Sequence, residues 1–231
     1  MKPLHGKNIL ITGATQGIGR SVAIGCAVAG ANVLLLGRNQ KRLMAVDDEI
    51  HALTGRHAHL IQFDLALTGA EEYRQLTAAI EENFSHLSAL VHCAAIFHGL
   101  APLEVFAADK FFSTMQANFH ARYLLTLSLL PLLRRGESGD VVFTLSPLAD
   151  KGQAYWGAYA LADAATRALY EVWSEEMAHD VVRLHVAKLP HSDTRLFRKA
   201  YPFYDQPLEQ PEIVANIILN LLILESEPVT T

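Results

Sequence analysis

The stretch Thr12-Gly13-Ala14-Thr15-Gln16-Gly17-Ile18-Gly19 decides the fold of this chain. It directly follows the apolar run Asn8-Ile9-Leu10-Ile11 and precedes a helix-compatible stretch that begins at Arg20. A strand, a glycine loop and a helix start in this order favour anion binding. The first helical turn has unpaired N–H groups, and glycines let the backbone approach an anion closely. The pattern therefore predicts a phosphate cradle at residues 12–19.

The sequence around the loop makes the signal specific, since glycine spacing alone is weak evidence in a loop. A second apolar run, Asn32-Val33-Leu34-Leu35-Leu36, follows the predicted helix and completes a βαβ unit. A unit of about 30 residues with such a loop is typical of dinucleotide binding rather than of an ordinary glycine turn. The loop residues predicted to bind the ligand are Gly13, Thr15, Gln16, Gly17, Ile18 and Gly19.

Composition bounds the class of protein. The chain has 231 residues, 51% hydrophobic and 19% charged, which favours a single domain over residues 1–231 with one large core. A net charge of −5 without a basic run argues against nucleic acid as a partner. The two cysteines, Cys26 and Cys93, lack the spacing of a disulfide or a metal site. Without a signal peptide or an apolar run of about 18 residues, we expect no membrane segment and a cytoplasmic protein.

Apolar runs alternate with helical patterns along the whole chain, which predicts an α/β fold with helices on both faces of a doubly wound parallel sheet. The six predicted strands are 8–12, 32–36, 58–63, 88–93, 140–145 and 182–189. Two long segments, 110–135 and 157–179, are apolar on more than one face. Such helices usually contact a second partner. We expect a homodimer through them, with a thick monomeric core as the alternative.

Several motifs occur in the order and spacing of a known family. The glycine loop is followed by Asp64 in Phe63-Asp64-Leu65, Asn118 inside a long helical pattern, Ser146 at the end of the fifth strand, Tyr159 and Thr194. Over nearly its whole length the chain therefore resembles the short-chain dehydrogenase/reductase family. The resemblance implies a Rossmann-type fold and hydride transfer between a nicotinamide cofactor and a small carbonyl or alcohol substrate.

The resemblance also implies roles for individual residues. Tyr159 would transfer the proton, Ser146 would hold the substrate oxygen, and Asn118 would position a water. Asp64 would lie on the adenine side and Thr194 at the nicotinamide amide, with Leu65 and Ala94 as further cofactor contacts. No metal site is implied.

The end of the second strand indicates which cofactor is preferred. An acidic residue there would accept hydrogen bonds from the ribose 2′-hydroxyl and repel a 2′-phosphate. This chain has Gly37-Arg38, and a guanidinium forms forked, charge-assisted hydrogen bonds with phosphate. We therefore predict NADP(H) in preference to NAD(H). The alternative is that Arg38 is only a solvated loop charge.

The chain departs from the family pattern at the nicotinamide end. The family has a lysine four residues after the tyrosine, which lowers its pKa and binds the nicotinamide ribose; here Asp163 stands there. Residues four apart share a helix face, so Asp163 should oppose ionisation of Tyr159. Lys151 or Lys188 could compensate. His92-Cys93-Ala94-Ala95 and Leu189-Pro190 also differ from the family's motifs, and Glu227 to Thr231 leave the usual seventh strand missing or truncated.

Two functions follow from this mixture. The first is an NADP-dependent oxidoreductase with impaired or unusual catalysis, favoured by Ser146, Tyr159 and Asn118. The second is a catalytically inactive NADP-binding homologue that acts as a sensor or as a partner subunit, favoured by Asp163 and Ala95. The substrate cannot be identified from the loop 195–211, whose aromatic residues suit an apolar lid and ordinary packing equally.

Overall fold

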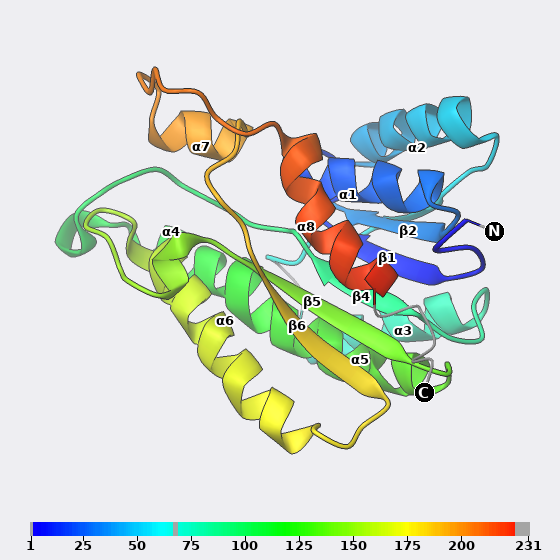
Figure 1. The fold of residues 1–231 in the computed structure, drawn as a ribbon. Coiled ribbons are helices and arrows are strands. Elements are labelled where there is room, and N and C mark those ends of the chain that lie inside the picture. The colour runs from blue at the N-terminus through cyan, green and yellow to red at the C-terminus, as the bar shows by residue number, and fades with distance from the viewer. Residues whose placement is uncertain (1, 67–68, 225–231) are drawn as a thin grey trace.

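A six-stranded parallel sheet forms the centre of the computed structural model, which describes residues 2–66 and 69–224 (Figure 1). Its strands are β1 (Asn8–Thr12), β2 (Asn32–Gly37), β3 (His59–Gln62), β4 (Ala89–His92), β5 (Gly139–Leu145) and β6 (Val182–Lys188). The strand order is β3-β2-β1-β4-β5-β6, and every neighbouring pair is parallel. The predicted fold class and the six predicted strands are confirmed.

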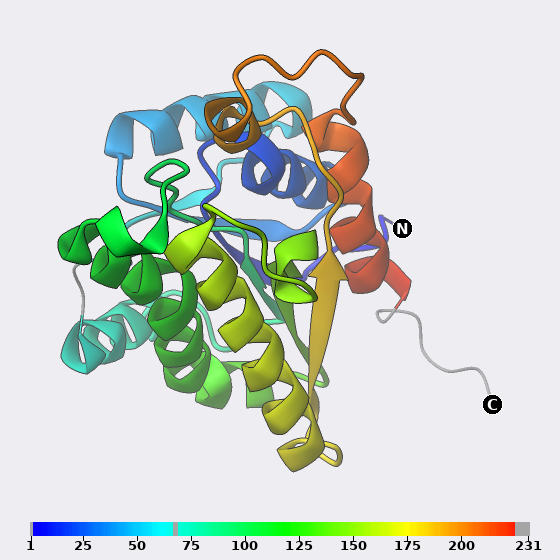
Figure 2. The ribbon, with the colours of Figure 1, turned by 90° about the vertical axis from the view of Figure 1, so that its left-hand side faces the viewer.

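Helices cover both faces of the sheet (Figures 1 and 2). One face carries α1 (Gly17–Val28), α2 (Gln40–Thr54) and α8 (Pro211–Leu224). The other carries α3 (Ala70–Glu81), α5 (Ala121–Arg134) and α6 (Gly157–Glu176), with α4 (Ala108–Met115) packed against α6. A short helix, α7 (Arg195–Ala200), follows β6.

Alternation along the strands explains the two layers. In β1, Ile9 and Ile11 face the α1 side while Leu10 faces the α3 and α5 side, and all three are at most 1% exposed. A parallel sheet covered on both faces needs apolar residues at nearly every strand position. The order of the strands reverses at β1, which has β2 on one side and β4 on the other. Ligands of such sheets bind beyond the carboxyl ends of the strands at this point.

The segment 110–135 is not one regular helix as predicted. It consists of α4, a π-helical turn at Gln116–His120 and α5, which contains Pro131. Buried residues occur within the π turn and directly after it, among them Ala117 and Ala121, so the apolar pattern that predicted a helix continues through the turn. The π turn contains Asn118, and such turns are frequent at functional sites.

Two further expectations can be placed against the described residues. The prediction that the seventh strand is missing or truncated concerns residues 227–231, which lie outside the described residues. Within residues 2–66 and 69–224, the helices are all too short or too polar to cross a bilayer. Helix α8 is not among the elements predicted from the sequence; it packs on α1 and contributes Ala215, Ile218 and Leu222 to the core.

Candidate active site

The glycine loop between β1 and α1 has room only for glycines at two positions. Gly13 has a φ of +66°, and a Cβ there would lie 2.7 Å from the Cα of Ala94. A Cβ on Gly19 would lie 2.5 Å from the carbonyl oxygen of Gly13. Real Cβ atoms do not approach backbone this closely, so only glycine fits at these two positions. The backbone N–H groups at the start of α1 are thus accessible to a bulky anion.

Thr12 ties the loop to the neighbouring strand. Its hydroxyl accepts hydrogen bonds from the backbone N–H groups of Cys93 and Ala94, both at 3.1 Å, and lies 3.4 Å from the carbonyl oxygen of Val91. These contacts join the ends of β1 and β4. They explain why the loop after β4 lies beside the glycine loop, and they fix Ala94 in the ligand crevice.

A single cavity of about 310 Å³ runs from the glycine loop to the ends of β5 and β6. Thirteen of the fourteen predicted site residues line it: Gly13, Thr15, Gln16, Gly17, Ile18, Gly19, Arg38, Asp64, Leu65, Ala94, Ser146, Tyr159 and Thr194. The structure thus brings together the loop, the Arg38 and Asp64 end, and the Ser146 and Tyr159 end. The remaining predicted site residue, Asn118, is not among the described residues that line the cavity.

Two arginines lie at the Asp64 end of this cavity. Arg38 follows β2 directly and is exposed, while Arg42 reaches the cavity from the first turn of α2. Arg42 donates a 3.4 Å hydrogen bond to the side chain of Gln16 in the glycine loop. Arg42 is not among the residues predicted from the sequence; it lies on the first turn of α2, whereas Arg38 precedes the helix.

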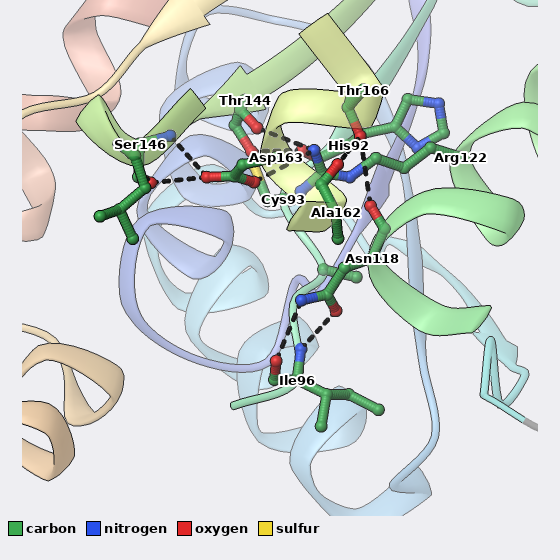
Figure 3. A network of polar contacts seen from close by, with 12 residues as sticks. His92, Cys93, Ile96, Asn118, Arg122, Thr144, Ser146, Ala162, Asp163 and Thr166 are labelled. Atoms are coloured by element: carbon green, nitrogen blue, oxygen red, sulfur yellow. Dashed lines mark hydrogen bonds and ion pairs between the residues drawn. The ribbon is translucent and has the colours of Figure 1, made fainter. Parts of the chain in front are cut away.

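Asn118 lies beneath the cavity and not in its wall. Its Oδ1 accepts from the N–H of Ile96 at 2.7 Å, and its Nδ2 donates to the carbonyl oxygen of Ile96 at 3.0 Å (Figure 3). Both ends of the amide are therefore occupied by the loop after β4. In this arrangement the side chain fixes the wall of the cavity from below. The backbone carbonyl oxygen of Asn118 accepts a 3.4 Å hydrogen bond from the hydroxyl of Thr166.

Ser146 and Asp163 form a close pair at the other end (Figure 3). The Ser146 hydroxyl donates to Oδ2 of Asp163 at 2.5 Å, and the Ser146 backbone N–H donates to the same oxygen at 3.0 Å. The Oγ of Ser146 accepts from the N–H of Leu148 at 3.3 Å. Asp163 is only 2% exposed. It points at Ser146, so it takes part in the site.

Arg122 is the positive charge beside this carboxylate (Figure 3). It is located on α5, its side chain is 4% exposed, and its Nη1 lies 3.8 Å from Oδ1 of Asp163. The same Nη1 donates to the carbonyl oxygen of Thr144 at 3.1 Å. Arg122 is not among the residues predicted from the sequence. The signal that could have found it was a lone arginine inside the apolar stretch 121–133.

The two lysines considered as replacements lie away from the pair. Lys188 binds Asp150 at 2.8 Å and its side chain is exposed. Lys151 is exposed in the loop before α6. Neither lines the cavity among the residues described, whereas Arg122 does. The charge beside Asp163 is therefore supplied by α5 rather than by a lysine.

Burial and charge act together on the two titratable groups. Burial raises the pKa of Tyr159 above its usual value, the Asp163 carboxylate raises it further, and Arg122 opposes both. Burial also raises the pKa of Asp163, while Arg122 and the hydrogen bonds from Ser146 oppose that shift. Tyr159 is consequently a neutral phenol at neutral pH, able to donate a hydrogen bond but not to act as a base.

Aromatic side chains surround Tyr159 on the outer side of the cavity. Its ring lies 5.9 Å from Phe97 and 5.4 Å from Trp156 between centroids. The indole N–H of Trp156 donates to the hydroxyl of Tyr201 at 3.2 Å, just after α7. Lys199 of α7 donates to the carbonyl oxygen of Phe97 at 2.8 Å. Helix α7 thus packs on the aromatic side chains that surround the tyrosine.

Thr194 begins this covering helix. Its hydroxyl accepts from the N–H of Phe197 at 3.2 Å and caps α7. A Cβ added at Gly17 would lie 3.3 Å from its Cγ2. Thr194 therefore lies against the glycine loop and borders the cavity between the loop and Ser146.

Comparisons with known proteins identify the family of this chain. The sequence pattern of the family described as short chain dehydrogenase matches residues 7–204. The Uncharacterized oxidoreductase YciK of Escherichia coli K12 is 35% identical over 209 residues, covering 90% of this chain and 81% of that protein. The chain belongs to the short-chain dehydrogenase family.

Solved structures show the same fold. A putative short chain dehydrogenase from Pseudomonas syringae superposes with a TM-score of 0.93 at 34% identity, covering 99% of this chain and 93% of that one. One from Escherichia coli CFT073, complexed with NADPH, superposes with a TM-score of 0.92 at 33% identity, covering 96% and 92%.

Proposed function

We propose that this protein is an NADP(H)-dependent oxidoreductase that reduces the carbonyl group of a small apolar substrate. The observation that carries the proposal is one continuous cavity, with a glycine cradle and two arginines at one end and Ser146 and Tyr159 at the other. The NADPH bound by the Escherichia coli CFT073 relative supports the choice of cofactor. When bound, the nicotinamide would supply the hydride.

The residues of the chain divide the work of binding. The glycine loop and the start of α1 suit the diphosphate, since Gly13 and Gly19 let the loop pack tightly against its neighbours and the first turn of α1 has backbone N–H groups beside the cavity. Arg38 and Arg42 suit a 2′-phosphate, because guanidinium groups form charge-assisted hydrogen bonds with phosphate oxygens. The residues present therefore fit the phosphorylated dinucleotide.

The ionisation of Tyr159 supports reduction as the working direction. Reduction needs a group that donates a proton to the substrate oxygen, and a neutral phenol provides it. Oxidation of an alcohol needs a base, and the raised pKa of Tyr159 disfavours its phenolate. The apolar side chains that line the cavity beside Tyr159, namely Trp156, Leu196 and Phe197, support an apolar substrate.

An inactive cofactor-binding protein is the second candidate. The observation in its favour is Asp163, which adds a negative charge where the family has a lysine. The nearby Arg122 reduces the weight of that observation, because the pair as a whole carries no net charge. We therefore favour an oxidoreductase with unusual catalysis and without the active-site lysine.

Cofactor titration tests the proposed function. NADPH and NADH binding is measured by energy transfer from the protein's tryptophans, for wild type, Arg38→Ala and Lys41→Ala. We expect Arg38→Ala to weaken NADPH binding by about tenfold, because one charge-assisted hydrogen bond to the 2′-phosphate is lost. NADH lacks this phosphate, so its binding should stay unchanged. Lys41 is exposed and does not line the cavity, so it is the matched control.

Turnover completes the test. NADPH oxidation is followed with a panel of aromatic aldehydes and ketones, using wild type and Tyr159→Phe. Turnover that Tyr159→Phe abolishes supports the proposal. Binding of NADPH without turnover of any carbonyl supports the inactive candidate, and binding of neither cofactor contradicts both.

The expected homodimer is also part of the proposal. Leu161, Ala164, Ala168 and Val172 form an exposed small and apolar stripe at three- and four-residue steps along α6. Tyr123 and Leu127 are exposed on neighbouring α5. A second copy of the chain would bury this surface. The cytoplasm stays the predicted compartment.

A further inference from the structure

The hydroxyl proton of Ser146 is already used inside the protein. The hydroxyl donates to Oδ2 of Asp163, and an ionised carboxylate can only accept. The backbone N–H of the same serine donates to that oxygen too. The Oγ of Ser146 can therefore offer the cavity only a lone pair, which accepts a hydrogen bond. A carbonyl substrate needs donors, so Tyr159 is left as the donor among these side chains.

The protonation state of Asp163 decides this arrangement. If the carboxyl were protonated, its O–H could donate to Ser146 and release the serine's own proton toward the cavity. Arg122, 3.8 Å from the other carboxylate oxygen, favours the ionised form by its charge. Arg122 thus acts on the substrate oxygen through two other residues.

A purely structural role explains the Arg122–Asp163 pair poorly. Nη1 of Arg122 and Oδ1 of Asp163 are too far apart for a hydrogen bond, and Nε of Arg122 has no partner in the described structure. Buried ion pairs stabilise a fold only when their geometry is good and their remaining donors are satisfied. The pair should therefore contribute little net stability, although Arg122 lines the cavity.

We propose that Arg122 is a positioning residue: it keeps Asp163 ionised, and Asp163 in turn holds the Ser146 proton, so that Ser146 accepts rather than donates toward the substrate oxygen. This proposal concerns the same site as the proposed function. Only its kinetic consequence rests on that function. The arrangement favours a hydroxyl product, which can donate to Ser146, over a carbonyl substrate, which cannot.

The other charged or titratable groups near the pair come from two elements. Tyr159 lies one helical turn before Asp163 on α6, and its neutral phenol leaves the charge balance unchanged. His92 and Cys93, at the end of β4, lie near Arg122. Burial and Arg122 lower the pKa of His92, and burial raises the pKa of Cys93 to about 12. Both are neutral at neutral pH, so the charges of the pair depend on Arg122 and Asp163.

Infrared spectroscopy of the purified protein tests the proposal without a substrate. Aspartate is labelled with ¹³C at its carboxyl group, and the Asp163 band is assigned by its absence in Asp163→Asn. We expect a carboxylate band at pH 7 in wild type and in Arg122→Lys. In Arg122→Met we expect a carboxylic acid band, because removal of the cation raises the pKa of Asp163. Thermal unfolding of each variant shows that it is folded.

Kinetics with NADPH and 4-nitrobenzaldehyde test the role of Ser146. As pH falls and Asp163 becomes protonated, the KM for the aldehyde should fall by about tenfold, the effect of one added hydrogen bond to the substrate oxygen. The KM for NADPH should stay constant. The transition should move to higher pH in Arg122→Met, return to the wild-type pH in Arg122→Lys, and vanish in Asp163→Asn.

Three results would overturn the proposal. These are a protonated Asp163 in wild type at pH 7, a carboxylate that persists in folded Arg122→Met, or a transition in KM that remains in Asp163→Asn. If Arg122→Met does not fold, the wild-type and Arg122→Lys spectra still decide the ionisation. If no variant reduces any carbonyl, the proposed function fails, and the infrared bands alone support or overturn the pair.

Discussion

At the scale of single residues, charge is balanced between two helices. Asp163 on α6 and Arg122 on α5 are buried side by side and have opposite charges. The two residues depend on each other, because either charge alone would be buried without a partner. Replacing Asp163 by lysine therefore places two cations side by side.

We predict that Asp163→Lys destabilises the protein by about 3–5 kcal/mol, the cost of breaking a buried pair and leaving an unpaired charge. The double variant Arg122→Met/Asp163→Asn removes both charges and should be more stable than Asp163→Lys by most of this amount, because it leaves no unpaired buried charge. Urea unfolding measures both. Asp150→Lys is the control, since Asp150 pairs with Lys188 on the surface and its loss should cost less than about 1 kcal/mol. Equal stability of the single and the double variant would contradict the prediction.

His92 makes the fold sensitive to acid. Its ring stacks on Phe143, and its Nε2 lies 2.8 Å from the hydroxyl of Thr126. Burial, and then Arg122, hold its pKa well below the usual value. The unfolded chain therefore takes up a proton below pH about 6.5 that the folded chain does not. Stability should be unaffected by His92 above that pH and should fall below it.

The expected slope is about 1.4 kcal/mol for each pH unit below about 6, for as long as the folded histidine stays neutral. Thermal unfolding between pH 7 and pH 5 measures it. His92→Phe/Thr126→Val removes the titrating group together with its partner and should show a shallower decline. Asp163, whose pKa is raised, acts in the opposite direction and is present in both proteins. Parallel pH profiles of wild type and variant would rule out this role of His92.

At the scale of elements, the turn between β1 and α1 is the part of the chain that we propose to bind the diphosphate. The glycines are required where backbone from another strand or from the loop itself leaves no space for a Cβ. Thr12 fixes that closeness by bonding the loop after β4. The rigid sheet thus positions a loop that would otherwise vary in shape.

We predict that Gly13→Ala lowers the free energy of unfolding by about 1–3 kcal/mol, from a left-handed backbone and overlap with Ala94, and weakens NADPH binding at least in proportion. Gly152→Ala is the matched control, because a Cβ there meets no atom within 4 Å and its φ is not positive. Urea unfolding and tryptophan energy transfer measure the two effects. An unchanged Gly13→Ala protein would show that the cradle is not tight in solution.

At the scale of the whole molecule, we predict that copies of the chain associate through the outer surface of α5 and α6. The exposed stripe on α6 is continuous over nearly three helical turns and consists of small and apolar residues. We predict a dimer in light scattering and a monomer for Leu161→Glu/Ala168→Glu. Leu53→Glu, an equally exposed position on α2, should remain a dimer. A wild-type monomer at micromolar concentration would refute the interface.

Local patterns in the sequence were sufficient for the fold and for one end of the site. The strands and the glycine loop follow from hydrophobic runs and residue spacing, because neighbours along the chain determine them. Arg38 and Asp64 follow directly from strand ends. The π turn at Gln116–His120 could not be predicted, since the apolar pattern that indicates a helix continues on both sides of it.

The sequence by itself determined a doubly wound sheet with a nucleotide cradle after β1, and it placed Asp163 beside Tyr159 on one helix face. Only the tertiary structure decided what that aspartate does. It brought Arg122 from another helix to the carboxylate, and it aimed the carboxylate at Ser146. The reason is physical: charge pairing in a core depends on how helices pack, and packing brings together residues that are far apart in the chain.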